Sequence, residues 1–392
     1  MTTKTTDLVE RSVTILPEIT KWRRHFHQFP ELSFQEKATS ETIVQILRSF
    51  DVYTIETEVG GYGVVATLTT GEGPVIGLRA DMDALPIYEQ TELSFGSKHP
   101  GVMHACGHDA HIAILLGGAK LLAEDAKNGL FKGTVKLIFQ PAEENCDVLG
   151  ETGAIKMLGS GTLDDVEAVL ALHMCPWLKT GELQVHDGPS MANNDDFHLI
   201  VKGNGGHGGY PHHTNDPVWM STYLLQALYS LNGRRVNPLE VGTISVGQIH
   251  AGEANNVIPS LVEIQGTVRS YKNEVRELLV KEIEGAARVV TALGGDFELT
   301  VHHGEPALVN DPAINNVIRK VADGMKVINE PFGMGSEDFS HMTARISGAM
   351  FFLGCGLEEE RSLHHPRFDI DEEALSDGVA IIVKSVYQLL EA

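Results

Sequence analysis

The chain has 392 residues, of which 42% are hydrophobic and 21% charged, and its formal net charge at pH 7 is −23. This length exceeds what one hydrophobic core comfortably serves and predicts two domains. The strongly acidic balance argues against nucleic acid or an anionic membrane as a partner. The start of the chain lacks the pattern of a signal peptide, and no stretch reaches the roughly 18 apolar residues of a spanning helix. With only four cysteines and no paired framework, we expect reduced thiols and a cytoplasmic protein.

The first part of the chain alternates helical and β-rich patterns. Apolar residues at helical spacing predict a first helix that ends near Phe29-Pro30 and a second helix from about Glu36 to Phe50. A strand, a strand, a helix, a strand and a strand are predicted next, at residues 63–70, 74–80, 111–125, 134–140 and 168–173. This alternation predicts an α/β fold, in which a mixed sheet is covered by helices on both faces.

The pattern changes at about residue 191 and changes back at about residue 306. Between them the order is strand, helix, strand, strand, helix, strand, which is typical of a ferredoxin-like βαββαβ unit. Such a unit is complete in itself, so we expect it to be inserted into the larger domain. A helix, an apolar strand and a closing helix follow it. The predicted parts are a catalytic domain formed by residues 1–190 and 307–392, and an inserted domain formed by residues 191–306.

Polar side chains gather where the predicted strands end, which is where open α/β sheets bind their ligands. Histidine, cysteine and carboxylate groups occupy these positions and the segment MHACGHDAH, which directly precedes a helix: Asp81, Asp83, Cys106, His108, Asp109, His111, Glu143, Glu144, His173, His364 and His365. Each of them alone has a structural explanation, and Asp109, for example, is a reasonable helix N-cap. Together they form the arrangement expected of a metal site.

The spacing of these residues supports a hydrolytic metal centre. Cys106 and His108 are two positions apart, so their side chains point to one face if the segment is extended. Gly107 between them removes a side chain from a crowded position. The adjacent Glu143 and Glu144 point in different directions if extended. One carboxylate can then bind metal while the other takes a proton from water and passes it to the leaving amine.

The candidate ligands are five in number: Cys106, His108, Glu144, His173 and His364. One tetrahedral ion with an open catalytic position needs fewer, and we therefore predict two divalent ions per subunit that share the nucleophilic water. The thiolate favours Zn, Co or Ni over Mg, and the majority of His and Glu ligands keeps Mn open. Nucleophilic catalysis by Cys106 is the competing hypothesis, and the carboxylate pair and further histidines exceed what it needs.

Long motifs spread over nearly the whole chain resemble a known family. They are RRHFHQFPELSFQE, GLRADMDALPI, MHACGHDAH, FQPAEE, ALHM, GGHGGYPHHTNDP, ANNVIPS, GTVRS, GSEDF and LHHPRFDID. In order and spacing they are similar to the amidohydrolase branch of the aminoacylase and carboxypeptidase-type metallopeptidases. That branch includes hippurate hydrolases, N-acetyldiaminopimelate deacetylases and auxin-conjugate hydrolases.

The resemblance implies roles for the residues of the catalytic domain. It implies that two divalent ions are held by Cys106, His108, Glu144, His173 and His364. Glu143 would be the general base, and Asp83 would orient a ligand without binding metal itself. His364 is preferred to His365 because of its spacing to Pro366. Glu337 and Asp338 of GSEDF either line the site or cap a helix.

The resemblance also implies that the inserted domain is a lid and the dimerisation surface of a homodimer. Within it, His207 and Asn256 are implied to stabilise the oxyanion or to bind substrate, reaching into the partner subunit's site. Arg269 is implied to pair with the substrate's free carboxylate. A salt-bridged strand arginine is the alternative interpretation of Arg269.

We therefore predict a metal-dependent amidohydrolase that cleaves N-acyl amino acids, with acetyl, benzoyl or a similar acyl group, into a carboxylic acid and an amino acid. A metallo-dipeptidase or carboxypeptidase with the same metals is the nearest alternative, and by resemblance the CGHDAH pattern favours the amidohydrolase. A dimer that binds metal or a small molecule without catalysis is the third hypothesis. Glu143 argues against it, because such a protein has no need of a base.

Overall fold

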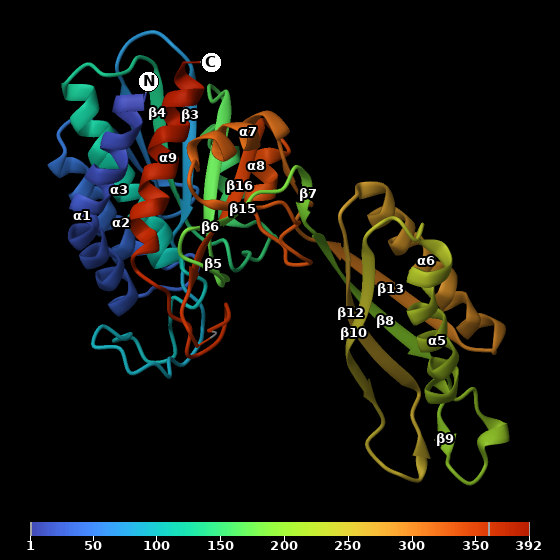
Figure 1. Cartoon of the computed structure of the whole chain (residues 1–392). Helices are drawn as coiled ribbons and strands as arrows, with labels where there is room; N and C mark the ends of the chain where they lie inside the picture. The colour runs from blue at the N-terminus through green and yellow to red at the C-terminus, as the bar shows by residue number, and fades with distance from the viewer. Residues whose placement is uncertain (1, 360, 392) are drawn as a thin grey trace. The chain divides into compact units, whose positions relative to one another are not determined.

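The computed structural model describes residues 2–359 and 361–391. The chain divides into two compact units, which Figure 1 shows. Unit 1 contains the described residues up to Gly188, the segment Val309–Phe332, and the described residues from Asp338 onward. Unit 2 contains Pro189–Leu308 and Gly333–Glu337. No helix among the described residues is long and apolar enough to cross a membrane.

Unit 1 is built on one mixed sheet of eight strands. In spatial order these strands are β1 (Thr54–Val59), β2 (Gly63–Thr69), β4 (Thr134–Gln140), β3 (Val75–Asp81), β5 (Ala168–Lys179), β16 (Ser347–Gly356), β6 (Glu182–Gln184) and β15 (Lys326–Ile328). The central strands β4, β3, β5 and β16 run parallel to one another, whereas β1 and β2 pair antiparallel at one edge. Parallel central strands of this kind are buried on both faces.

Helices cover both faces of this sheet. The helices of unit 1 are α1 (Thr2–Gln28), α2 (Lys37–Ser49), α3 (His108–Lys127), α4 (Gly153–Gly159), α7 (Pro312–Val321), α8 (Phe339–Thr343) and α9 (Ala374–Leu390). Helices α1, α3 and α9 pack against one another over one face, as Figure 1 shows, and share its core with Leu78 and Leu137. Helices α4 and α8 contact β4, β5 and β16. Ile138 and Val169 are buried there, and Ile138 points to the opposite face of the sheet from its neighbour Leu137. The predicted α/β fold is confirmed.

The register of the central strands explains why polar residues meet at one edge. Asp81 and Gln140 are paired partners at the carboxyl ends of β3 and β4. Arg79 of β3 pairs with Ala171 of β5, which sets His173 level with Asp81. The strand was expected to end at His173, and this is wrong, because β5 continues to Lys179. It continues because β16 goes on pairing with it beyond His173.

Unit 2 is a four-stranded antiparallel sheet with two helices. Its elements are β8 (Asn193–Lys202), β9 (Gly206–His207), the 3-10 helix η1 (Pro211–His213), α5 (Pro217–Arg235), β10 (Gly242–Ala251), β11 (Val257–Ile258), β12 (Leu261–Ser270), α6 (Asn273–Ala292) and β13 (Asp296–His303). The strand order β10-β12-β8-β13 is that of a ferredoxin-like unit, as predicted. Its core lies between the sheet and both helices. The short strands β7 (Gly188–Met191) and β14 (Leu308–Asn310) lie where the chain passes between the units.

Candidate metal centre

Five side chains of unit 1 that are potential metal ligands converge at the carboxyl ends of the central strands. Cys106 Sγ lies 3.5 Å from His173 Nε2 and 3.3 Å from His364 Nε2. Glu144 Oε1 lies 3.3 Å from His364 Nε2 and 3.8 Å from His108 Nε2. These residues come from four separate segments of the chain. Two groups of three that could each hold one ion share Cys106: Cys106, His108 and His173, and Cys106, Glu144 and His364. Two further groups combine His108 with Asp81 and His111, or with Glu143 and Glu144.

Two buried atoms of this cluster that could bind a metal ion make no hydrogen bond, as expected of metal ligands. His108 Nε2 and Glu144 Oε1 are buried without a hydrogen-bond partner. A buried polar atom left in this way is costly in a folded protein. The other nitrogen of His108 donates to the carbonyl oxygen of Asp83 at 2.9 Å, which turns Nε2 into the cluster. In the same way His173 Nδ1 donates to the Met174 carbonyl at 2.9 Å, which leaves Nε2 for a metal.

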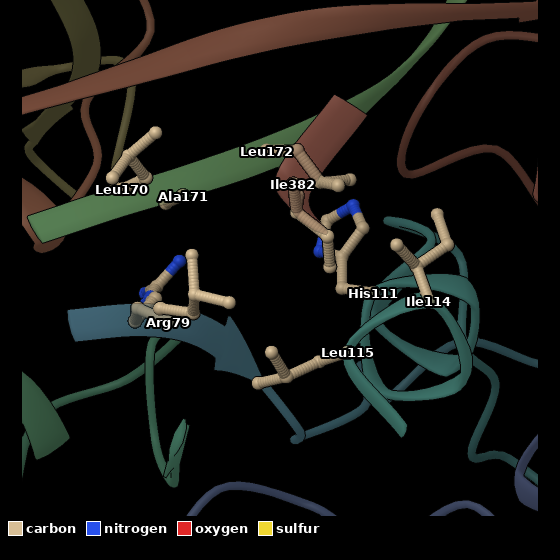
Figure 2. A pocket seen from close by; sticks show the side chains of 9 residues that line it. Arg79, His111, Ile114, Leu115, Leu170, Ala171, Leu172 and Ile382 are labelled. Carbon is tan, nitrogen blue, oxygen red and sulfur yellow. The ribbon is translucent and has the colours of Figure 1, made fainter. Parts of the chain in front are cut away.

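His111 lies beside this cluster but its ring nitrogens are both engaged. Its Nε2 accepts the Met174 backbone N–H at 2.9 Å, so Nδ1 carries the proton that is donated to Asp81 at 2.6 Å. Figure 2 shows His111 and Arg79 beside apolar side chains such as Leu170 and Ile382. The space that they line is about 10 Å³, which is room for a single water at most. His111 therefore supports the cluster indirectly, by holding the backbone of Met174 beside His173.

Cys106 and His108 reach the cluster through a left-handed glycine between them. The segment is not extended, because His108 is already the first residue of α3 and Gly107 has φ 90°. A Cβ on Gly107 would lie 3.0 Å from the Met174 Cβ. The crowding that the sequence suggested at Gly107 is therefore real, and its source is the strand that carries His173. The expected N-cap role of Asp109 is also wrong, because Gly107 occupies the N-cap position.

Glu143 and Glu144 lie on the turn that follows β4. Asp83 holds this turn, because its Oδ2 accepts the Glu144 backbone N–H at 3.0 Å and the Ser33 hydroxyl at 2.6 Å. Glu143 Oε2 lies 4.0 Å from His108 Nε2, beside the ligand cluster. Both glutamates and Asp83 thus lie within 4.0 Å of His108.

The electrostatics of the cluster favour a cation. Burial opposes protonation of His108, but the carboxylates of Asp81 and Asp83 outweigh it and raise its pKa to about 10. Burial, together with the charges of Glu144 and Glu143, holds the pKa of the Cys106 thiol well above its usual value. A divalent ion reverses both effects, since it favours the neutral imidazole and the thiolate as ligands. The donor set of thiol, imidazole and carboxylate fits divalent transition metals.

A buried network of charges surrounds Asp109, the residue that follows His108 in the sequence. Asp109 accepts from Arg23 Nε at 3.1 Å and from His27 Nδ1 at 2.9 Å. The second nitrogen of His27 lies 3.3 Å from Glu89. Burial opposes the positive charge of His27, but Asp109 and Glu89 prevail and raise its pKa to about 9. This network ties α1 to the first turn of α3.

A second buried network involves Arg79, which the sequence did not single out. Its guanidinium donates to Asp81 at 2.7 Å, to Asp338 at 2.8 Å and to the Gln140 side chain at 2.9 Å. Asp338 was expected to line the site or to cap a helix. It occupies the N-cap position of α8, but its side chain makes no capping bond and accepts from Arg79 and Gln140 instead. Its neighbour Glu337 is buried and belongs to unit 2.

His364 rather than His365 belongs to the cluster. The His364 backbone N–H donates to the Ala105 carbonyl at 2.8 Å, which attaches this loop to the segment that carries Cys106. The residue has φ 59°, an uncommon conformation for a residue other than glycine. His365 is exposed and its Nδ1 accepts the Arg367 backbone N–H at 3.1 Å.

The remaining predicted residues belong to unit 2. His207 on β9 and Asn256 just before β11 are neighbours, because His207 pairs with Val257 and the Gly208 N–H donates to the Asn256 carbonyl at 2.8 Å. Both side chains are exposed. Arg269 lies near the carboxyl end of β12 and donates to the Met334 carbonyl and the Ser336 hydroxyl, each at 3.3 Å. It makes no ion pair with any residue that the structure describes, so the salt-bridged alternative is not supported.

Comparison with known proteins identifies the family. A model of peptidase family M20/M25/M40 matches residues 77–388. The chain belongs to this family. It is 38% identical to thermostable carboxypeptidase 1 of Saccharolobus solfataricus, over 95% of this chain and 96% of that protein. It is 39% identical to N-acetyl-L-cysteine deacetylase of Bacillus subtilis, over 94% of this chain and 88% of that protein.

A solved structure of the M20 family agrees with the fold. The YXEP protein of Bacillus subtilis, described as a dinuclear metal binding peptidase, matches with a TM-score of 0.84 and 34% identity. The match covers 96% of this chain and 99% of that protein. The predicted family resemblance is thereby confirmed, and the chain is an M20 metallo-hydrolase of the amidohydrolase and peptidase type that uses divalent metal ions.

Proposed function

We propose that this M20 hydrolase cleaves the amide bond of N-acyl amino acids and releases a carboxylic acid and an amino acid. The observation that carries the proposal is the convergence of five ligand side chains in two overlapping groups that share Cys106, with a further carboxylate, Glu143, beside them. Similarity to N-acetyl-L-cysteine deacetylase supports an acyl group that is a simple acid.

The proposed ligands of two divalent ions per subunit are Cys106, His108, Glu144, His173 and His364. His108 Nε2 is buried without a hydrogen-bond partner, and Glu144 Oε1 faces two other proposed ligands, His364 and His108, at 3.3 and 3.8 Å, which supports this assignment. Ions of this kind supply Lewis acidity that polarises a carbonyl oxygen and makes water more acidic near neutral pH. We propose Zn, Mn, Co or Ni, because the set mixes a thiolate with imidazoles and a carboxylate. Asp83 positions His108 and the Glu144 turn and is not itself a ligand.

Glu143 is the proposed general base. It takes the proton of the water that attacks the amide carbon, and it delivers that proton to the leaving amine nitrogen as the C–N bond breaks. A carboxylate close to the ligand cluster is the geometry that such proton transfer needs. Cys106 as nucleophile is disfavoured, because burial and the neighbouring carboxylates keep its thiol protonated when no metal is bound.

Unit 2 is proposed to act as lid and as dimerisation surface. Its helix α5 exposes Trp219, Tyr223 and Tyr229, and β10 is an edge strand of its sheet. Exposed aromatic residues and an unpaired strand edge are typical of surfaces that pair with another chain. His207 and Asn256 are proposed to stabilise the oxyanion or to bind substrate in the partner subunit's site. Arg269 is proposed to pair with the substrate carboxylate.

The proposal is tested with enzyme stripped by a chelator and reloaded with each of the four metals. The substrates are N-acetyl, N-benzoyl and indole-acyl amino acids beside simple dipeptides, and bound metal is measured by elemental analysis. We expect cleavage of acyl amino acids that returns with metal. His364→Ala should lower the metal content and abolish most activity, whereas the adjacent control His365→Ala should change neither. No turnover with any metal contradicts the proposal.

A carboxypeptidase is the second candidate, and the 38% identity to thermostable carboxypeptidase 1 favours it. It requires the same ligands and the same base, and differs in what flanks the scissile amide. Cleavage confined to dipeptides and longer peptides in the same substrate panel would select the carboxypeptidase. Cleavage of acyl amino acids alone would exclude it.

A further inference from the structure

Two side chains of the segment between α1 and α2 contact residues that adjoin the metal centre. Leu32 forms a parallel β-bridge with Ala84, and the Ala84 N–H donates to the Glu31 carbonyl at 2.8 Å. These contacts fix the segment beside Asp83. The Ser33 hydroxyl then donates to Asp83 at 2.6 Å. This contact accounts for part of the motif PELSFQE, to which the proposed reaction assigns no role.

Glu36, at the end of this segment, does not cap its own helix. It occupies the N-cap position of α2, but its side chain makes no capping bond. Glu31 caps the first turn of α2 instead, since its carboxylate accepts the Thr39 backbone N–H at 2.8 Å and the Thr39 hydroxyl at 2.9 Å. The fully buried Glu36 is thereby released to reach a residue 106 positions away, where it accepts the Ala142 backbone N–H at 2.8 Å.

Ala142 directly precedes Glu143 and Glu144 and holds an unfavourable backbone conformation. Its φ is 48°, in the left-handed region, which residues with a Cβ adopt at a cost. Its peptide groups are held on both sides, because its N–H donates to Glu36 and its carbonyl accepts the Gly153 N–H at 2.9 Å. Backbone conformations of this kind persist only where surrounding contacts enforce them.

We propose that Glu36 is a positioning residue, which holds the left-handed Ala142 so that Glu143 and Glu144 point into the metal centre. Asp83 holds the other end of the same turn through the Glu144 N–H at 3.0 Å. The two glutamates therefore lie between two clamps, both supported by the segment Glu31–Glu36. The inference rests on the proposed function, since it takes Glu144 as a ligand and Glu143 as the base.

The test uses the metal-loaded full-length enzyme and three variants. Glu36→Gln keeps an oxygen that accepts the Ala142 N–H, so its kcat should stay within about threefold of the wild type. Glu36→Leu removes the acceptor, so kcat should fall by about 10- to 100-fold with little change in KM, and the Kd for Zn²⁺ in a chelator competition should rise by about tenfold. In the double variant Glu36→Leu/Ala142→Gly, glycine adopts the left-handed conformation freely, so about fivefold of the lost kcat should return.

A stability control separates positioning from a loss of folding. Asp311 caps α7 through the Ala313 N–H at 2.7 Å, away from the turn. Asp311→Ala should lower the Tm and leave kcat and the Kd for Zn²⁺ unchanged. The inference is overturned if Glu36→Leu matches the wild type, if Glu36→Gln is as impaired as Glu36→Leu, or if glycine at position 142 restores nothing.

Failure of the proposed function would look different. If the wild-type enzyme binds no stoichiometric metal, or if the Glu143→Gln variant keeps full turnover, the roles of the turn residues themselves are contradicted. A wild-type enzyme that binds metal and needs Glu143, together with indifferent Glu36 variants, contradicts the positioning role alone.

Discussion

Replacing Gly107 with alanine should destabilise unit 1 and weaken the metal centre at once. The residue has φ 90°, so a Cβ brings the cost of the left-handed region, about 1–2 kcal/mol. The new Cβ would also lie 3.0 Å from Met174 Cβ and 3.6 Å from Phe368 Cζ, inside a packed core. Overpacking of this kind costs about 1–3 kcal/mol. We therefore expect the free energy of unfolding to fall by about 2–5 kcal/mol.

Urea unfolding at a fixed metal concentration measures this change, and metal analysis follows the centre. Gly181 is the matched control, since its φ is 85° but nothing lies within 4 Å of its Cβ position. Gly181→Ala should therefore show the backbone cost alone and keep its metal. Because Met174 adjoins His173, Gly107→Ala should also lose metal more readily. Equal destabilisation by the two variants would refute the inference that Gly107 is needed for close approach to β5.

Three further predictions concern proton transfer, ligand orientation and pH. Glu143→Gln should bind metal normally and lose about 10²- to 10⁴-fold in kcat, and full turnover would contradict its role as base. Asp83→Ala removes the carboxylate that accepts the Glu144 N–H at 3.0 Å and lies 3.3 Å from His108 Nδ1, so it should raise the Kd for Zn²⁺ by about 10- to 100-fold in a chelator competition. An unchanged Kd would contradict the role of this side chain in holding the two ligands. His27 has a pKa raised from 6.5 to about 9, so its stabilisation is complete below pH 6.5 and is lost as pH rises through 9. Unfolding measured from pH 6 to 10 should show the advantage of the wild type over His27→Gln shrinking by about 3 kcal/mol, and a constant difference would contradict the assignment.

Most of the regular elements could be predicted because their patterns are long. The helix at His108–Lys127 and the strand at Thr134–Gln140 carry clear apolar periodicity or continuous apolar runs. The three-residue strands β6 and β15 could not be predicted in this way. Runs of that length show no periodicity, and they are strands only because a neighbouring strand offers hydrogen bonds. The continuation of β5 past His173 has the same cause, since β16 pairs with it there.

The gathering of the site residues could be predicted from topology, but their backbone geometry could not. Parallel strands that end together place Asp81 beside Gln140 and bring the residues that follow them close together. The left-handed Ala142 is held by Glu36, and the space for a side chain at Gly107 is taken by Met174, and both partners are distant in sequence. The sequence could indicate crowding at Gly107, but it could not show which residue causes that crowding or that Ala142 is left-handed.

The pair His108 and His111 shows why a sequence motif alone cannot assign metal ligands. Both histidines lie on the first turn of α3, both are buried, and both could bind metal by composition. What separates them is the partner of one nitrogen. His111 Nε2 takes the Met174 N–H, so the ring is committed to hydrogen bonds, whereas His108 Nε2 has no such partner. Because His111 holds the backbone beside His173, its effect on the centre passes through the orientation of that ligand rather than through a bond to metal.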